Sequence, residues 1–250
     1  AMIKEEIDAE EVMRKYDRES NTRIWEGTPK VVISIMLAAF SVYCIFMTLF
    51  STALPETRLS LFLAFVTIVG YMMYPIRKSH VRPNHMPWYD IVLMAVGAAC
   101  FFYFAFNATE IIHMGSRIQP LQIAVALVGT LILMELCRRC VGIPILVVVI
   151  CLLVYVFYWQ FNNGTNLYMT LRNLTSKLFY STSGLIGTPI NVCYTYIVLF
   201  IIFGAFLERT GIAEFFISLA NRIAGWSSGG AAKVAVISSA LCGMVSGSSV

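Results

Sequence analysis

Residues 31–50 read VVISIMLAAFSVYCIFMTLF and contain no charged side chain. About 20 consecutive apolar residues cross the hydrocarbon core of a bilayer as a helix. Because lipid offers backbone N–H and C=O groups no partners, spanning segments are helices or closed barrels, and long unbroken apolar runs favour helices. Five similar stretches follow, at residues 59–76, 88–106, 121–136, 143–159 and 189–207. The sequence therefore predicts an all-α, polytopic membrane protein with about six transmembrane helices.

The overall composition agrees with a membrane protein. Of the 250 residues, 58% are hydrophobic and 13% charged, whereas a soluble domain carries about 25% charged residues. The net charge of +4 is spread between the apolar stretches rather than gathered in one block, which argues against a nucleic-acid partner. The seven cysteines fall almost entirely within apolar stretches, where a thiol behaves as a small hydrophobe, so we expect no disulfide framework. Cys137 and Cys140 lack the second pair that a zinc or redox site would need.

The distribution of Lys and Arg predicts the orientation, because loops on the cytoplasmic side accumulate positive charge. Thirteen of these residues precede the first stretch or fall in every second loop after it, and four, Arg58, Arg117, Arg172 and Lys177, fall in the other loops. We therefore expect the N-terminus to be cytoplasmic. Asp90, Glu135 and Glu208 lie near the ends of spans. Pairing with Arg139 or Arg209 is a sufficient explanation for these three acidic residues.

Two stretches are amphipathic at helical spacing and are interpreted as surface helices. Residues 167–178 set leucines opposite Arg172, on the external side. Residues 212–224 set apolar residues opposite Glu214 and Arg222, on the cytoplasmic side. For the first stretch, packing against neighbouring helices explains the pattern equally well.

The segment 227–250 differs from the other apolar stretches, because 15 of its 24 residues are Ser, Gly or Ala. Small residues recur every four positions, as close helix packing requires, at Ala231, Ala235, Ser239, Gly243 and Gly247. The run ends in Ser246, Gly247, Ser248 and Ser249, a hydroxyl-rich turn at membrane depth. Secondary transporters use such broken helices to hold ions and substrate, although a small-residue helix interrupted by glycine is an open alternative.

Enzymatic chemistry finds little support in the sequence. Residues 243–247, GMVSG, depart from the G-x-S-x-G of a hydrolase elbow, and the histidines, His80, His85 and His113, lie in loops. No G-x-x-x-x-G-K-[ST] motif occurs, so ATP is not hydrolysed on this chain. We expect no catalytic or cofactor-binding residues, and an intramembrane hydrolase is the least favoured interpretation.

Four stretches together resemble the fused permease of tripartite ATP-independent periplasmic (TRAP) transporters, of the type paired with a TAXI-type periplasmic binding protein. They are residues 15–23 (KYDRESNTR), 199–211 (LFIIFGAFLERTG), 229–233 (GGAAK) and 246–250 (SGSSV). Their order and spacing carry the resemblance, which covers nearly the whole chain.

The resemblance implies a division of the chain into four parts. Residues 1–30 form a charged cytoplasmic helix, and residues 31–142 a four-helix region like the small subunit. Residues 143–188 hold a connecting transmembrane helix and an external surface helix. Residues 189–250 begin the ion-translocating large subunit and end in the tip of a re-entrant hairpin, so we expect the chain to be a fragment.

The resemblance also implies a function, that of a Na⁺-coupled permease in the bacterial inner membrane. It would import an organic anion, commonly a carboxylate, from the TAXI-type binding protein by an elevator motion. Ser246, Gly247, Ser248 and Ser249 would supply part of a Na⁺ site, because a helix C-terminus carries roughly half a negative elementary charge. A membrane scaffold or anchoring subunit without transport is the alternative.

Overall fold

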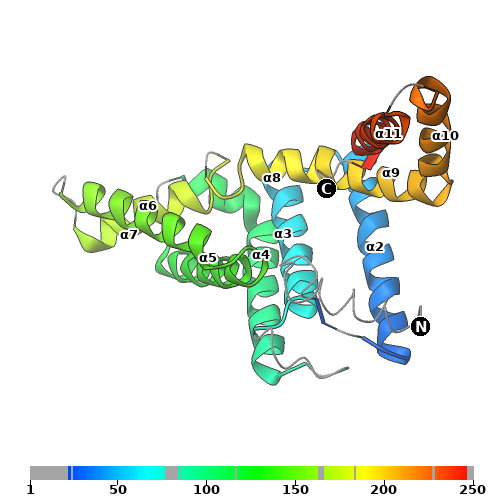
Figure 1. Ribbon diagram of the computed structural model, residues 1–250. Helices are drawn as coiled ribbons and strands as arrows, with labels where there is room; N and C mark the ends of the chain where they lie inside the picture. The colour runs from blue at the N-terminus through cyan, green and yellow to red at the C-terminus, as the bar shows by residue number, and fades with distance from the viewer. Residues whose placement is uncertain are drawn as a thin grey trace. The chain divides into compact units, whose positions relative to one another are not determined.

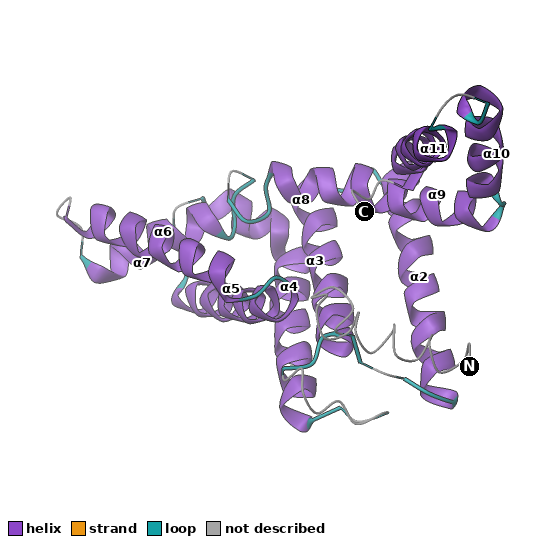
Figure 2. Ribbon diagram, in the orientation of Figure 1, coloured by secondary structure: helices purple, strands orange, loops and turns teal. Residues whose placement is uncertain are grey.

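The structure is a computed structural model, and it describes residues 22–23, 25–76, 84, 86–115, 117–162, 166–182, 184–226 and 229–246. This part of the chain is helical and contains no strand (Figure 2). It divides into two compact units. The first holds the described residues of Ala1–Phe40 and Thr52–Thr188, and the second those of Ser41–Ser51 and Pro189–Val250.

Among the described residues, six helices are long and apolar enough to cross a membrane. They are α2 (Thr28–Phe50), α3 (Pro55–Met73), α4 (Trp88–Met114), α5 (Pro120–Cys140), α6 (Ile143–Asn162) and a sixth at Thr188–Leu207. The sixth is composed of α8 (Thr188–Val192), the π-helix η1 (Cys193–Ile197) and the first part of α9 (Val198–Arg209). The predicted all-α, polytopic fold is confirmed.

The first unit is built on the packing of α3, α4 and α5 (Figure 1). Gly97 of α4 lies where the three helices meet, and a β-carbon there would lie 2.8 Å from methyl groups of both Thr67 and Ile132. Hydrogen bonds also join these helices. The Ser60 hydroxyl donates to the Phe101 carbonyl, and the Tyr71 hydroxyl donates to the Ile132 carbonyl, both at 2.7 Å. Small residues and hydrogen bonds of this kind hold helices together in lipid.

The chain after α7 (Leu167–Leu178) anchors that helix to the same unit. Phe179 stacks on Phe101 with ring centroids 5.6 Å apart, and the Tyr180 hydroxyl donates to the Gln122 carbonyl at 2.8 Å. Burial raises the pKa of Tyr180, so its hydroxyl stays protonated and able to donate. The helix α7 also contacts α5 and α6. Leu171, Leu174 and Leu178 are half-buried, whereas Leu167 is exposed, so both interpretations of this stretch stay open.

The second unit contains α9, α10 (Ile212–Ala224) and α11 (Gly230–Ser246), which contact one another. Gly211 adopts a left-handed conformation, with φ of 77°, at the turn into α10. Ala220 and Ala224 of α10 are buried against Val234 of α11, in the orange and red helices of Figure 1. The second helix of this pair, α11, contains the start of the segment for which ion binding is predicted.

Candidate functional site

Ser246, the first residue of the predicted Na⁺ site, is the last residue of α11. Gly247, Ser248 and Ser249 lie outside the described residues. The structure therefore describes the predicted site only at its first residue, Ser246. The ligand set itself stays a prediction.

The small-residue face of α11 is turned away from α10. Val234 and Ile237 make the contact with α10, whereas Ala231, Ala235 and Ser239 are exposed. At Gly243, an added β-carbon would meet no atom within 4 Å. No described residue packs closely on this face, so the predicted close helix packing also stays a prediction.

The π-helix η1 lies within the sixth span and was not expected from the sequence. Such π-turns inside α-helices are frequent at functional sites, because they break the regular i→i−4 hydrogen-bond ladder. The Thr195 hydroxyl donates to the Asn191 carbonyl at 2.7 Å, and Tyr194 is fully buried. A cavity of about 570 Å³ lies alongside, and its lining includes Thr48, Thr195 and Phe203. No residue spacing in the sequence signals a π-turn.

Charged side chains, three buried and two partly exposed, form a group at one end of the first unit, here called the charge cluster. Its members are Arg23, Asp90, Glu135, Arg138 and Arg139. Arg23 forms an ion pair with Asp90, and Arg139 Nη1 lies 2.8 Å from Asp90 Oδ1 as a second ion pair. The Asp90 and Arg139 side chains are 0% exposed, and the Arg23 side chain is 3% exposed. Asp90 is therefore held between two guanidinium groups.

Glu135 extends the charge cluster toward the end of α5. It accepts a hydrogen bond from Arg139 Nε at 2.9 Å and two from Arg138, each at 2.7 Å. The predicted pairing of Asp90 and Glu135 with Arg139 is confirmed. The Glu208 side chain lies outside the described residues.

The C-terminal end of α3 and the residue after it hold the two buried arginines in place. The Arg23 amide donates to the Met73 carbonyl at 2.8 Å. The Arg139 guanidinium carbon lies 4.7 Å from the centre of the Tyr71 ring, a cation–π contact, and Arg139 Nη1 donates to the Tyr74 carbonyl at 3.3 Å. Arg23 is therefore buried, although it lies at the end of a charge-rich stretch of the sequence. Its partner, Asp90, is 67 residues away in the sequence.

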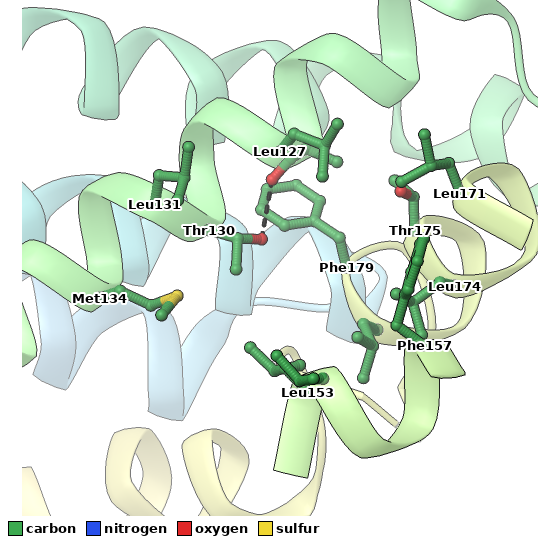
Figure 3. A pocket seen from close by; sticks show the side chains of 13 residues that line it. Leu127, Thr130, Leu131, Met134, Leu153, Phe157, Leu171, Leu174, Thr175 and Phe179 are labelled. Carbon is green, nitrogen blue, oxygen red and sulfur yellow. Dashed lines mark hydrogen bonds between the residues drawn. The ribbon is translucent and has the colours of Figure 1, made fainter. Parts of the chain in front are cut away.

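An apolar cavity of about 300 Å³ lies between α5, α6 and α7. Figure 3 shows Leu131 and Met134 of α5, Leu153 and Phe157 of α6 and Leu171 of α7 around it. Thr130 also lines this cavity, but its hydroxyl donates to the Ala126 carbonyl at 2.8 Å, within its own helix. The lining therefore suits a hydrocarbon group and supplies no catalytic or ion-binding group.

A comparison with known protein families identifies the second half of the sequence. Residues 128–250, from the middle of α5 through α11, match the family model described as tripartite ATP-independent periplasmic transporter, DctM component. This part of the chain belongs to the membrane permease of a TRAP transporter. Together with the six apolar helices among the described residues, this match supports a multi-pass protein of the inner membrane. The comparisons with curated proteins and with solved structures found no match.

Proposed function

We propose that this TRAP permease takes up an organic anion, a carboxylate, by Na⁺-coupled secondary transport with an elevator motion. The observation that carries the proposal is the match of residues 128–250 to the DctM component. A TRAP permease works with a periplasmic substrate-binding protein, and for this chain we propose one of the TAXI type. Coupling to Na⁺ would supply the energy, since the chain has no nucleotide-binding motif.

We also propose the fused domain arrangement, with residues 31–142 acting as the small subunit and residues 143–188 as the connection. The exposure of α6 supports this division, because none of its described residues is buried. A helix that connects two membrane regions has its surface available to lipid and to the remainder of a transporter.

The proposed orientation places the N-terminus in the cytoplasm. The distribution of Lys and Arg supports it. The charge cluster is consistent with it, because Arg23 before α2, Asp90 at the start of α4 and Arg139 at the end of α5 meet at one end of the first unit. These are the positions that the charge distribution assigns to one side of the membrane.

The proposed Na⁺ site combines the C-terminal end of α11 with the hydroxyls and carbonyls of Ser246, Gly247, Ser248 and Ser249. Oxygen ligands suit a hard cation, and the negative end of the helix dipole favours positive charge. Such a site needs no carboxylate, and α11 contains none.

Substrate uptake measured against Na⁺ concentration tests the proposal, using full-length protein in liposomes with its binding protein present. Ser246→Ala and Ser248→Ala should raise the Na⁺ concentration for half-maximal uptake about threefold to tenfold, because each removes one oxygen ligand worth about 1 kcal/mol. Gly247→Val should abolish uptake by distorting the turn. Ser238→Ala is the matched control, since its hydroxyl donates to the Ala235 carbonyl of the same helix at 3.2 Å.

The possible outcomes separate the two candidate functions. Uptake that is independent of Na⁺ would refute the coupling, and unchanged Na⁺ dependence in all three variants would refute the site.

The exposed small-residue face of α11 favours a scaffold or anchoring subunit as the second candidate. That function predicts binding of partner proteins without any flux of substrate.

A further inference from the structure

The charge cluster carries an excess of positive charge. Among the described residues, its ion pairs join three arginines, Arg23, Arg138 and Arg139, to two carboxylates, Asp90 and Glu135. All but Arg138 and Glu135 are almost fully buried. A buried charge without a counter-charge is costly, so the cluster favours a bound anion.

Two nitrogen atoms of the cluster have hydrogen-bonding capacity left over. Arg23 Nη1 and Arg139 Nη2 are buried and have no hydrogen-bond partner among the described residues. Guanidinium groups present their N–H donors in a planar fork that matches the oxygen atoms of carboxylate and phosphate. The leftover donors therefore suit an oxyanion.

A cavity of about 210 Å³ adjoins the part of the charge cluster at the end of α5, where Arg138 and Arg139 line it and Arg23 does not. Arg138 and Arg139 form its polar wall, and the rest of its lining is Pro75, Ile76, Gly142, Ile143 and Pro144. Arg138 is 33% exposed, so one side of the cavity is open to an approaching ligand. The lining thus suits a ligand that joins an anionic group to apolar carbon.

The cavity lies where three membrane-spanning helices begin or end. Pro75 and Ile76 follow α3, Arg138 and Arg139 belong to the last turn of α5, and Ile143 and Pro144 open α6. Phospholipid phosphates lie at this depth, and basic pockets between transmembrane helices bind anionic headgroups. We propose that this cavity binds the phosphate of an anionic phospholipid headgroup, held by Arg138 and Arg139.

Native mass spectrometry of the full-length protein in detergent tests this site by titration with phosphatidylglycerol and phosphatidylcholine. Both lipids carry a phosphate, but only the first has a net negative charge. The protein should bind phosphatidylglycerol at least tenfold more tightly. Arg138→Gln should weaken that binding about tenfold, the loss of one charge-assisted hydrogen bond, while Arg139 still pairs Glu135 and Asp90. Arg117→Gln makes the same charge change at an exposed residue before the other end of α5 and should have no effect.

Three results would overturn the proposal. Equal binding of the two lipids would remove the case for an anion, and equal effects of Arg138→Gln and Arg117→Gln would remove the case for this cavity. The third measurement is competition between inorganic phosphate and phosphatidylglycerol for the protein. If inorganic phosphate displaces phosphatidylglycerol at equal concentration, the site holds free phosphate rather than a lipid headgroup.

Discussion

At the scale of single residues, Asp90 is the most constrained charge that the structure describes. Its carboxylate is completely buried between Arg23 and Arg139. Taking ions out of water costs several kcal/mol each, and mutual attraction repays this cost only while every partner is present. Asp90 thus fastens the segment before α2, through Arg23, to the start of α4 and the end of α5.

Replacing Asp90 by Asn should destabilise the protein by about 3 kcal/mol, because two buried guanidinium groups lose their shared counter-charge. The free energy of unfolding of the full-length protein, measured by denaturant titration in detergent, checks this. Glu110→Gln is the control, since Glu110 is exposed near the other end of the same helix and should change stability by less than about 0.5 kcal/mol. Equal stability of the two variants would show that the buried ion pairs contribute nothing.

At the scale of the elements, α4 depends on Gly97 for its contact with both neighbouring helices. Gly97→Val should destabilise the packing of α3, α4 and α5 by about 1–3 kcal/mol, because the added methyl groups overlap Thr67 and Ile132. The unfolding midpoint in detergent measures the effect. Ala99→Val adds similar bulk at an exposed position of α4 and should be neutral. A neutral Gly97→Val would mean that the helices separate without cost at this contact.

At the scale of the whole molecule, the proposed orientation predicts which residues face the cytoplasm. Glu26→Cys and Arg117→Cys, each in a cysteine-free background, probe the two sides, since both residues are exposed. A membrane-impermeant maleimide added to intact cells should label the cysteine at position 117 and leave that at position 26 unlabelled. The reverse pattern would invert the topology, and labelling of both would contradict the predicted number of spans between them.

Much of the fold is predictable from the sequence, because burial in lipid demands long apolar helices whatever their neighbours are. The predicted stretch 143–159 corresponds to α6, Ile143–Asn162, and the stretch 189–207 to the sixth span, Thr188–Leu207. The π-turn at Cys193–Ile197 was not predictable, since apolar length is unchanged when the hydrogen-bond ladder shifts by one residue.

Local composition and order are enough to predict the membrane-spanning helices, the run of serine and glycine that follows α11's small-residue face, and the resemblance to TRAP permeases. The folded arrangement was needed to find that Arg23 is buried, that Asp90 lies between two arginines and that a cavity opens beside Arg138. The physical reason is that a charge near a span end can face water or a partner. The choice depends on residues far away in the sequence that fold against it.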